Sequence, residues 1–347
     1  MIVIRKYVLF VILVLATKTG LLAQQEDVYI HGKGTKINER CGSCHSLRRG
    51  DPHPDQNPVE YCYRCHGSKE NIERNKKYKV IPPDYFPFDI SEEFTKPSHH
   101  PLENARLHHR REILPEVNPQ AKRHGSCWDC HHAHKSVKKT KTDKGKKKKS
   151  TFPKLTYEYE LCYKCHSYSA NLPVGRKNKA IEFQTTNPSF HPVEGEGKNS
   201  NVPSLLLPYN PKSNLNCLDC HNNDDSRGPE GPHGSIYTPI LNKNYTTGDG
   251  YLENDFTYAL CYQCHSRQSI LGNQSFPYHS LHILDKKISC YSCHNSHGSV
   301  KYTHLIEFPL GRVLPDSFGR IEFIDEGLFR GRCYLKCHEV EHSPKTY

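Results

Sequence analysis

Apolar residues form one long run near the start of the chain and are sparse elsewhere. Tyr7 to Ala16 is an uninterrupted apolar stretch that follows the basic pair Arg5 and Lys6, and the small residue Ala23 precedes a polar segment. These features are typical of a secretory signal peptide. We therefore expect residues 1–23 to be a signal peptide rather than an uncleaved anchor. No later stretch is apolar enough to span a bilayer, so we expect an exported, periplasmic or extracellular protein without a membrane span.

The remaining pattern predicts little regular structure. Apolar residues make up 35% of the 347 residues, below the roughly 45–50% usual for soluble domains, and the mean hydropathy is −0.78. The chain has 22 Gly and 24 Pro, which argue against long helices. We expect a mostly irregular fold with short α-helices and little or no β-sheet, in which something other than aliphatic side chains fills the core.

The cysteines fall into eight motifs, in each of which a histidine follows the second cysteine. Seven motifs read Cys-x-x-Cys-His and the eighth reads Cys-x-x-x-Cys-His, and together they use all 16 cysteines. Numbered in chain order, the motifs are Cys41/Cys44/His45, Cys62/Cys65/His66, Cys127/Cys130/His131, Cys162/Cys165/His166, Cys217/Cys220/His221, Cys261/Cys264/His265, Cys290/Cys293/His294 and Cys333/Cys337/His338.

This spacing predicts covalent attachment of c-type haem. Two thiols add to the two vinyl groups of one porphyrin, and the adjacent histidine reaches the iron as its proximal ligand. The alternatives are zinc ribbons and thioredoxin-like redox pairs; a zinc ribbon needs no histidine after each pair, and a thioredoxin site is single. For the eighth motif, the alternative is a disulfide or a lost site. We expect eight covalently bound haems c, each with its iron, and porphyrins that supply most of the buried apolar surface.

The motifs occur in pairs, and each pair begins a similar unit. We divide the chain into four dihaem units, at residues 24–90, 91–175, 176–275 and 276–347, which form one continuous chain of haems. A histidine precedes the first motif of each unit, as in His100-Pro101-Leu102-Glu103 and His191-Pro192-Val193-Glu194. Another histidine follows it, as in His233-Gly234-Ser235 and His297-Gly298-Ser299.

In these motif pairs the chain resembles the multihaem cytochromes built on the doubled Cys-x-x-Cys-His motif. The resemblance covers roughly residues 28–342, and it is specific in the motif pairs and loose between them. It implies a multihaem electron carrier and does not identify a redox partner.

The sixth ligand of each iron is expected to be a second histidine. The only methionine is Met1, which is lost with the signal peptide, so His/Met ligation, which raises the potential, is excluded. The 24 histidines leave 16 beyond the eight proximal ones. The repeat selects eight distal ligands: His31, His53, His100, His134, His191, His233, His282 and His297. His279 is the nearest competitor of His282, and His99 of His100.

The positive charge of the sequence is weak evidence for nucleic acid binding. The formal net charge is +11, but loss of the signal peptide and about one negative charge per oxidised haem bring the holoprotein close to neutral. One lysine run stands out, at Lys135, Lys138, Lys139, Lys141, Lys144 and Lys146 to Lys149. It is either a solvated insertion or a docking site for an acidic partner.

Three functions fit the sequence. The first is an octahaem electron-transfer protein, not an enzyme, that relays electrons through closely stacked bis-His haems. Its partners would be donor and acceptor cytochromes or membrane quinol oxidation complexes, with no nucleic acid. The second is a multihaem reductase of a small inorganic nitrogen or sulfur oxyanion. The third is a subunit of an extracellular cytochrome filament, in which the protein is a homo-oligomer.

Overall fold

The computed structural model describes residues 58–78, 87–102, 124–132, 146, 155–167, 172 and 177–347. The predicted signal peptide and the first motif (Cys41, Cys44, His45) lie outside these residues. So do the distal ligands predicted at His31, His53 and His134. Of the lysine run, only Lys146 is described.

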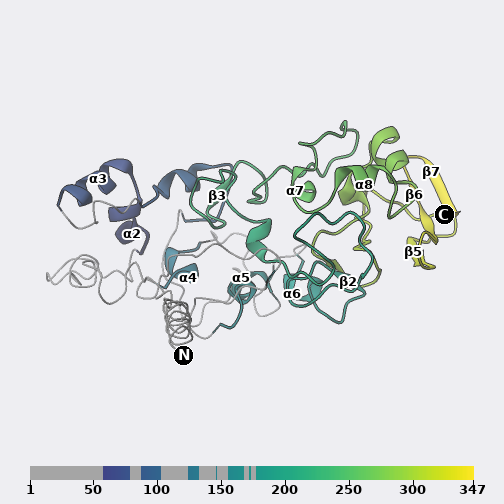
Figure 1. Cartoon of the computed structure of the whole chain (residues 1–347), viewed down its shortest axis with the longest axis horizontal. Coiled ribbons are helices and arrows are strands. Elements are labelled where there is room, and N and C mark those ends of the chain that lie inside the picture. The colour runs from purple at the N-terminus through teal and green to yellow at the C-terminus, as the bar shows by residue number, and fades with distance from the viewer. Residues whose placement is uncertain are drawn as a thin grey trace, which may run out of the picture.

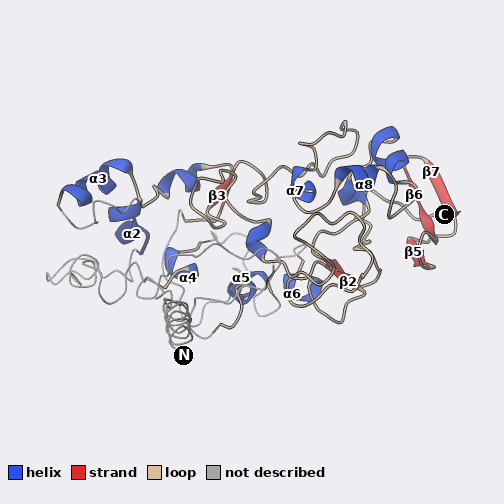
Figure 2. Cartoon of the chain, in the orientation of Figure 1, coloured by secondary structure: helices blue, strands red, loops and turns tan. Residues whose placement is uncertain are grey.

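Short helices and irregular loops make up most of the described chain (Figure 2). The α-helices are α2 (Pro58–His66), α3 (Lys69–Lys77), α4 (Cys127–Cys130), α5 (Tyr159–His166), α6 (Lys179–Glu182), α7 (Ala259–Tyr262) and α8 (Arg267–Leu271). The 3₁₀ turns are η2 (Ser91–Thr95), η3 (Cys217–Asp219) and η5 (Cys290–Ser292), and η4 (Leu281–Asp285) is a π-helical turn. Within the described ranges, no helix has the length and apolar character needed to cross a membrane.

Two short strand pairs join segments that are far apart in the sequence. Strand β1 (Ser98–His99) pairs antiparallel with β3 (Gly234–Ser235). Strand β2 (Ser189–Phe190) pairs in the same way with β4 (Gly298–Ser299). Each pair therefore connects one unit to the following unit.

A third sheet lies at the C-terminal end. Strands β5 (Glu322–Asp325), β6 (Gly331–Cys337) and β7 (Val340–Thr346) form an antiparallel sheet in the order β5-β6-β7. The sequence led us to expect little or no β-sheet, and this three-stranded sheet was not predicted. It contains the eighth motif, whose cysteines lie on β6.

At the third and fifth motifs, a capping box fixes the residue at which the helical turn begins. In the third motif, Ser126 and Asp129 form a capping box around α4, and in the fifth motif Asn216 and Asp219 do the same around η3. Such a box satisfies the first free N–H groups of a turn. In the seventh motif a serine, Ser292, stands at the corresponding position, and a carboxylate from a distant loop supplies the acceptor instead.

Helices α2 and α3 lie at one end of the long axis of the molecule and the C-terminal sheet lies at the other; between them the chain doubles back, so that β3 lies nearer to α2 and α3 than β2 does (Figure 1). Buried apolar side chains such as Ile72, Phe190 and Leu335 are spread along this axis. One continuous cavity of about 3430 Å³ is lined by residues from Cys62 to Tyr347. The motifs are therefore arranged around a shared interior space.

Candidate haem-binding sites

In most of the described motifs, the two cysteines and the histidine lie on a single helical turn. The second and fourth motifs lie in α2 and α5. In four other motifs the histidine N–H donates to the carbonyl of the first cysteine: His131 to Cys127 (2.8 Å), His221 to Cys217 (2.8 Å), His265 to Cys261 (3.0 Å) and His294 to Cys290 (2.8 Å). Because side chains three residues apart are neighbours on a helical turn, the two thiols can face one porphyrin edge and the histidine follows beside them.

The second motif departs from this arrangement at Cys65. Cys62 and His66 line the cavity, but Cys65 does not, although the cysteines of the other described motifs all do. Cys65 lies about 60° further round α2 than Cys62, on the side away from His66. Helix α2 is also at the end of the described row of motifs (Figure 1), and His31, the upstream histidine of this unit, lies outside the described residues. The cavity therefore does not support the thioether role of Cys65, which stays a prediction from the sequence.

The eighth motif has a different backbone. Cys333 and Cys337 lie on β6, four residues apart on a strand, which is a separation of roughly 13 Å at about 3.3 Å per residue. The turn after this strand contains His338 and Glu339, which have φ angles of 46° and 65°. The eighth motif therefore does not form the one-turn arrangement of the others.

Four histidines that the repeat selects as distal ligands each lie opposite a motif histidine. The ring centres are separated by 6.5 Å in His100–His166, 5.9 Å in His131–His233, 6.4 Å in His191–His265 and 6.2 Å in His221–His297. A metal–imidazole bond of about 2 Å on each side, together with roughly 1.1 Å from nitrogen to ring centre, places two axial rings about 6.3 Å apart. The four separations match this axial spacing.

The Nδ1 atoms of several of these histidines are held by backbone carbonyl groups. Nδ1 of His100 lies 2.7 Å from the carbonyl of Pro232, and Nδ1 of His191 bonds the carbonyl of Ser296. Among the motif histidines, His221 and His294 bond the carbonyls of Pro239 (3.1 Å) and His304 (3.0 Å). Metal-ligating histidines almost always make such a bond with their other nitrogen, so Nε2 is the atom left for the iron.

The pairing of histidines repeats from unit to unit. The upstream histidine of a unit lies opposite the second motif histidine of the same unit, as in His100–His166 and His191–His265. The downstream histidine lies opposite the first motif histidine of the preceding unit, as His297 does opposite His221. The strand pairs β1–β3 and β2–β4 create this arrangement, because they join the His-Pro segment of one unit to the His-Gly-Ser segment of the next.

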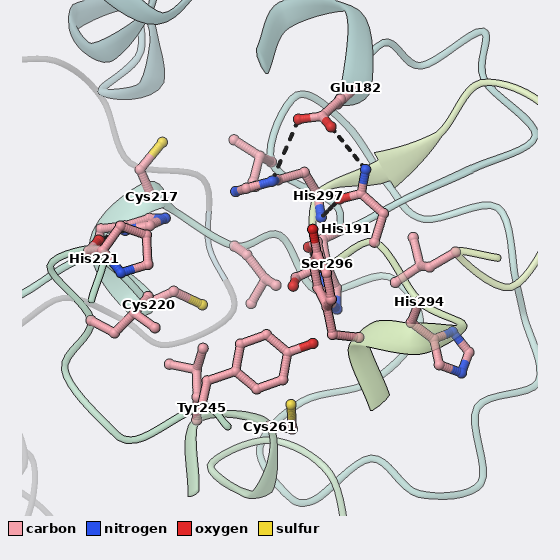
Figure 3. Close-up of a pocket in the computed structure, with 18 of the residues that line it drawn as sticks. Glu182, His191, Cys217, Cys220, His221, Tyr245, Cys261, His294, Ser296 and His297 are labelled. Atoms are coloured by element: carbon pink, nitrogen blue, oxygen red, sulfur yellow. Dashed lines mark hydrogen bonds and ion pairs between the residues drawn. The ribbon is translucent and has the colours of Figure 1, made fainter. Parts of the chain in front are cut away.

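The same two residue types, a glutamate followed by a phenylalanine, support each strand pair. Phe94 packs edge-on against His233, and Phe183 packs edge-on against His297. The residue before each phenylalanine is a buried glutamate, Glu93 or Glu182. In Figure 3, Glu182 lies above His297, and His191 lies beside Ser296. The Glu-Phe pair is thus a repeat in the sequence besides the cysteine motifs. It lies away from those motifs and was not among the predicted site residues.

The last unit departs from this pairing. His282, the residue that the repeat selects, does not lie opposite His294; that place is taken by His279, with ring centres 6.4 Å apart. The ring of His282 instead lies 6.5 Å from that of His342. The eighth motif histidine, His338, places Nε2 3.1 Å from a carboxylate oxygen of Asp249.

Burial favours the neutral form of several of the paired histidines. It lowers the pKa of His265 and of His294 to about 4 and that of His279 to about 3, in each case through desolvation of the charged form. Burial also lowers the pKa of His191 and His221. A neutral imidazole is the form that binds a metal, so these side chains are ready to act as ligands at neutral pH.

The motifs contact one another in chain order. The first cysteine of an even-numbered motif lies close enough to the first cysteine of the next motif for the two thiols to shift each other's pKa: Cys62 and Cys127, Cys162 and Cys217, and Cys261 and Cys290. Within a unit, the second cysteine of the first motif lies in electrostatic range of the cysteines of the second motif: Cys130 to Cys162 and Cys165, Cys220 to Cys261 and Cys264, and Cys293 to Cys333 and Cys337. Two kinds of junction therefore alternate from the second motif to the eighth.

The donor set and the cavity fit haem. The described cysteines, Cys65 included, are free of disulfide bonds, so their thiols are available for thioether formation. The cavity volume of about 3430 Å³, shared by the seven described motifs, gives about 490 Å³ for each, within the roughly 300–1,000 Å³ of a single-ligand site. In Figure 3, the thiols of Cys217 and Cys220 and the ring of His221 lie on the side of the pocket opposite His294. Haem bound there supplies a one-electron iron couple, and the chain supplies its attachment and axial ligands.

Comparison with known families gives one match. The family model described as outer membrane cytochrome MtrC/MtrF-like, domains II/IV, matches residues 36–191. This region contains the first four motifs and covers a little under half of the chain. Neither the curated proteins nor the solved structures contain a match. The match supports a c-type cytochrome of a multihaem family.

Proposed function

We propose that the protein is an octahaem c-type cytochrome that relays electrons along a single row of bis-His haems. The observation that carries this proposal is the contact between motifs in chain order, from Cys62 to Cys337, around one continuous cavity. Porphyrins bonded at neighbouring thiols, such as those of Cys162 and Cys217, would have their edges close together. Electrons then have a short step from each haem to the next.

The chain contributes the axial ligands and the shielding. Histidines on both sides of the cavity would hold a bound iron at both of its axial positions, which would leave no position for a substrate. Two imidazole ligands favour a lower potential than His/Met ligation. The arrangement supports electron transfer rather than reduction of a bound oxyanion.

The family match supports a location at or beyond the outer membrane and other redox proteins as partners. The matched family is described as an outer membrane cytochrome, and the sequence begins with the features of a signal peptide. We propose that the protein accepts electrons from one cytochrome or quinol oxidation complex and passes them to another acceptor. An extracellular filament would be one form of the same function.

The first test is the haem content of protein matured in its native host or in a host with a c-type maturation system. We expect intact mass spectrometry to show eight covalently added haems on a chain without residues 1–23. The reduced protein should show low-spin spectra and bind no carbon monoxide. The unmodified polypeptide mass would reject the proposal, and several carbon monoxide-binding irons would favour a reductase.

A further inference from the structure

We propose that Glu182 and Lys179 set the reduction potential of the fifth haem by acting on its distal ligand, His297. This assignment rests on the proposed function, because it needs a haem whose iron lies between His221 and His297. Neither Glu182 nor Lys179 belongs to a cysteine motif or to the repeated histidines. Both residues act through His297, so they are positioning residues and not ligands.

The Nδ1 atom of His297 faces two charged groups. It lies 3.4 Å from Oε2 of Glu182 and 3.3 Å from Nζ of Lys179. The Nδ1 atoms of His100 and His191 instead meet backbone carbonyl groups, which are neutral dipoles. The distal ligand of the fifth haem therefore has charged neighbours at the position where these two other ligands have neutral ones.

The short helix α6 holds the two charges together. It begins at Lys179 and ends at Glu182, and the side chain of Asn178 accepts the N–H of Ile181 (3.3 Å) at its start. Asn187 donates to the carbonyl of Glu182 (2.9 Å) at its end. Residues three apart are neighbours on a helical turn, and Nζ of Lys179 donates to Oε2 of Glu182 at 2.5 Å. The carboxylate and the ammonium group thus approach His297 as one unit.

A second contact fixes the other oxygen of Glu182. Nδ2 of Asn295 donates to Oε1 of Glu182 at 2.8 Å, and Oδ1 of Asn295 accepts the N–H of His297 at 3.0 Å. Figure 3 shows dashed contacts at both carboxylate oxygens of Glu182. The side chain of Glu182 is only 6% exposed, and solvent ions screen buried charges much less than exposed ones. The charge of this carboxylate therefore acts on the ligand with little attenuation.

The chemistry of the imidazole gives the sign of each effect. A neutral imidazole that binds a metal through Nε2 carries its proton on Nδ1, and this N–H needs an acceptor, which Glu182 supplies and the ammonium group of Lys179 does not. A carboxylate partner raises the basicity of a metal-bound histidine, and its negative charge favours ferric over ferrous iron. The positive charge of Lys179 has the opposite effect. We therefore expect Glu182 to lower the potential and Lys179 to raise it.

The test is a spectroelectrochemical titration of the fully matured variant Glu182→Gln at pH 7. We expect one of the eight haems to move to a higher potential by about tenfold in its reduction equilibrium constant, or ~59 mV for a one-electron couple. In Lys179→Met, the same haem should move to a lower potential. Unchanged potentials, or shifts of the same sign in both variants, would overturn the proposal.

Spin state separates an effect on the potential from damage to the site. We expect every iron of Glu182→Gln to remain low-spin in electron paramagnetic resonance and to bind no carbon monoxide when reduced, because His297 stays in place. An iron that becomes high-spin and binds carbon monoxide would show that Glu182 only holds the fold, and would reject the proposal.

The matched control is Glu307→Gln, which removes the next carboxylate of the same network. Oε2 of Glu307 accepts from Nδ2 of Asn295 at 2.7 Å, and the side chain of Glu307 is 32% exposed beside Lys177. We expect a clearly smaller shift, since this charge is one hydrogen bond further from the ligand. An equal shift would show that contact with His297 is not what sets the potential.

A combined variant assigns the shift to the fifth haem. Glu182→Gln is placed in a protein in which Cys217→Ser and Cys220→Ser remove the attachment of that haem. We expect the seven remaining potentials to be the same with and without Glu182→Gln. A shift among them would locate the effect at another haem and overturn the assignment. Failure of haem attachment in the unmodified protein would instead reject the octahaem function itself.

Discussion

At the scale of single residues, carboxylate groups hold two tyrosine side chains that each follow a motif cysteine. Tyr163 and Tyr262 each follow the first cysteine of a motif, and their hydroxyl groups donate to Glu194 (2.7 Å) and Glu253 (2.9 Å). The sequence could not predict the carboxylate partners, because Glu253 comes from a loop with no repeat in the other units.

Glu253 gives a prediction for the dependence of stability on pH. Burial opposes its ionisation, but hydrogen bonds from Arg267 (2.7 Å) and Tyr262 outweigh that effect and hold the pKa of Glu253 below its ordinary value. A carboxylate with a lowered pKa stabilises the folded state at pH values above its pKa in the unfolded chain, about 4.3. This stabilisation is lost as the pH falls through the lower pKa of the folded state. We expect Glu253→Gln to unfold about 1–3 kcal/mol more easily at pH 7, and the difference to shrink below pH ~4.

Thermal unfolding across this pH range measures the effect. Asp255→Asn is the control, since the side chain of Asp255 is 92% exposed beside the same arginine and exposed pairs contribute little. A Glu253→Gln deficit that is constant from pH 7 to pH 3 would contradict the ionic explanation.

At the scale of the elements, the two strand pairs depend on glycine for close approach. A Cβ atom on Gly234 would lie 1.7 Å from the carbonyl oxygen of Glu93, and a Cβ on Gly298 would lie 2.0 Å from that of Glu182. We expect Gly234→Ala and Gly298→Ala each to destabilise the protein by about 1–3 kcal/mol, as overpacking does. The displaced histidine should also leave one iron open in each variant.

Chemical denaturation and carbon monoxide titration test both parts of this prediction. Gly125→Ala is the matched control, because its Cβ would lie 3.8 Å from the nearest atom, the carbonyl oxygen of Pro101. Wild-type stability and no carbon monoxide binding in Gly298→Ala would show that the strand pair does not position His297.

The elements also show how far the sequence determines the site. The doubled motif and its flanking histidines selected His100, His191, His233 and His297, because each is attached to a local repeat, and the structure places each of them opposite a motif histidine. The repeat could not distinguish His279 from His282, since both lie within four residues. The strand at Cys333–Cys337 was not foreseen, because cysteines four residues apart are also compatible with a helical turn. Long-range pairing with β5 and β7 decides the backbone there.

At the scale of the whole molecule, the row of motifs predicts that a central haem is indispensable for transfer from end to end. Cys217→Ser combined with Cys220→Ser removes the attachment of the fifth haem. We expect a protein with seven haems in which electron exchange between the two ends slows by orders of magnitude. Pulse radiolysis, followed by re-equilibration of the haem spectra, measures this exchange.

The control removes the haem at the end of the row. Cys333→Ser combined with Cys337→Ser also gives a protein with seven haems, but it leaves the contacts from the second to the seventh motif unchanged. We expect its remaining haems to equilibrate at the original rate. Equal slowing in both variants would contradict a single linear path.

The sharing of histidines between neighbouring units has a consequence for how the chain is completed. In the proposed array, the first iron of a unit would gain its second axial ligand only when the following unit is in place, as His297 would complete the site of His221. One iron would therefore remain unsaturated at the edge of a partly assembled chain. In the fourth unit, His279 faces His294 from within the same unit, so this iron would need no ligand from a further unit.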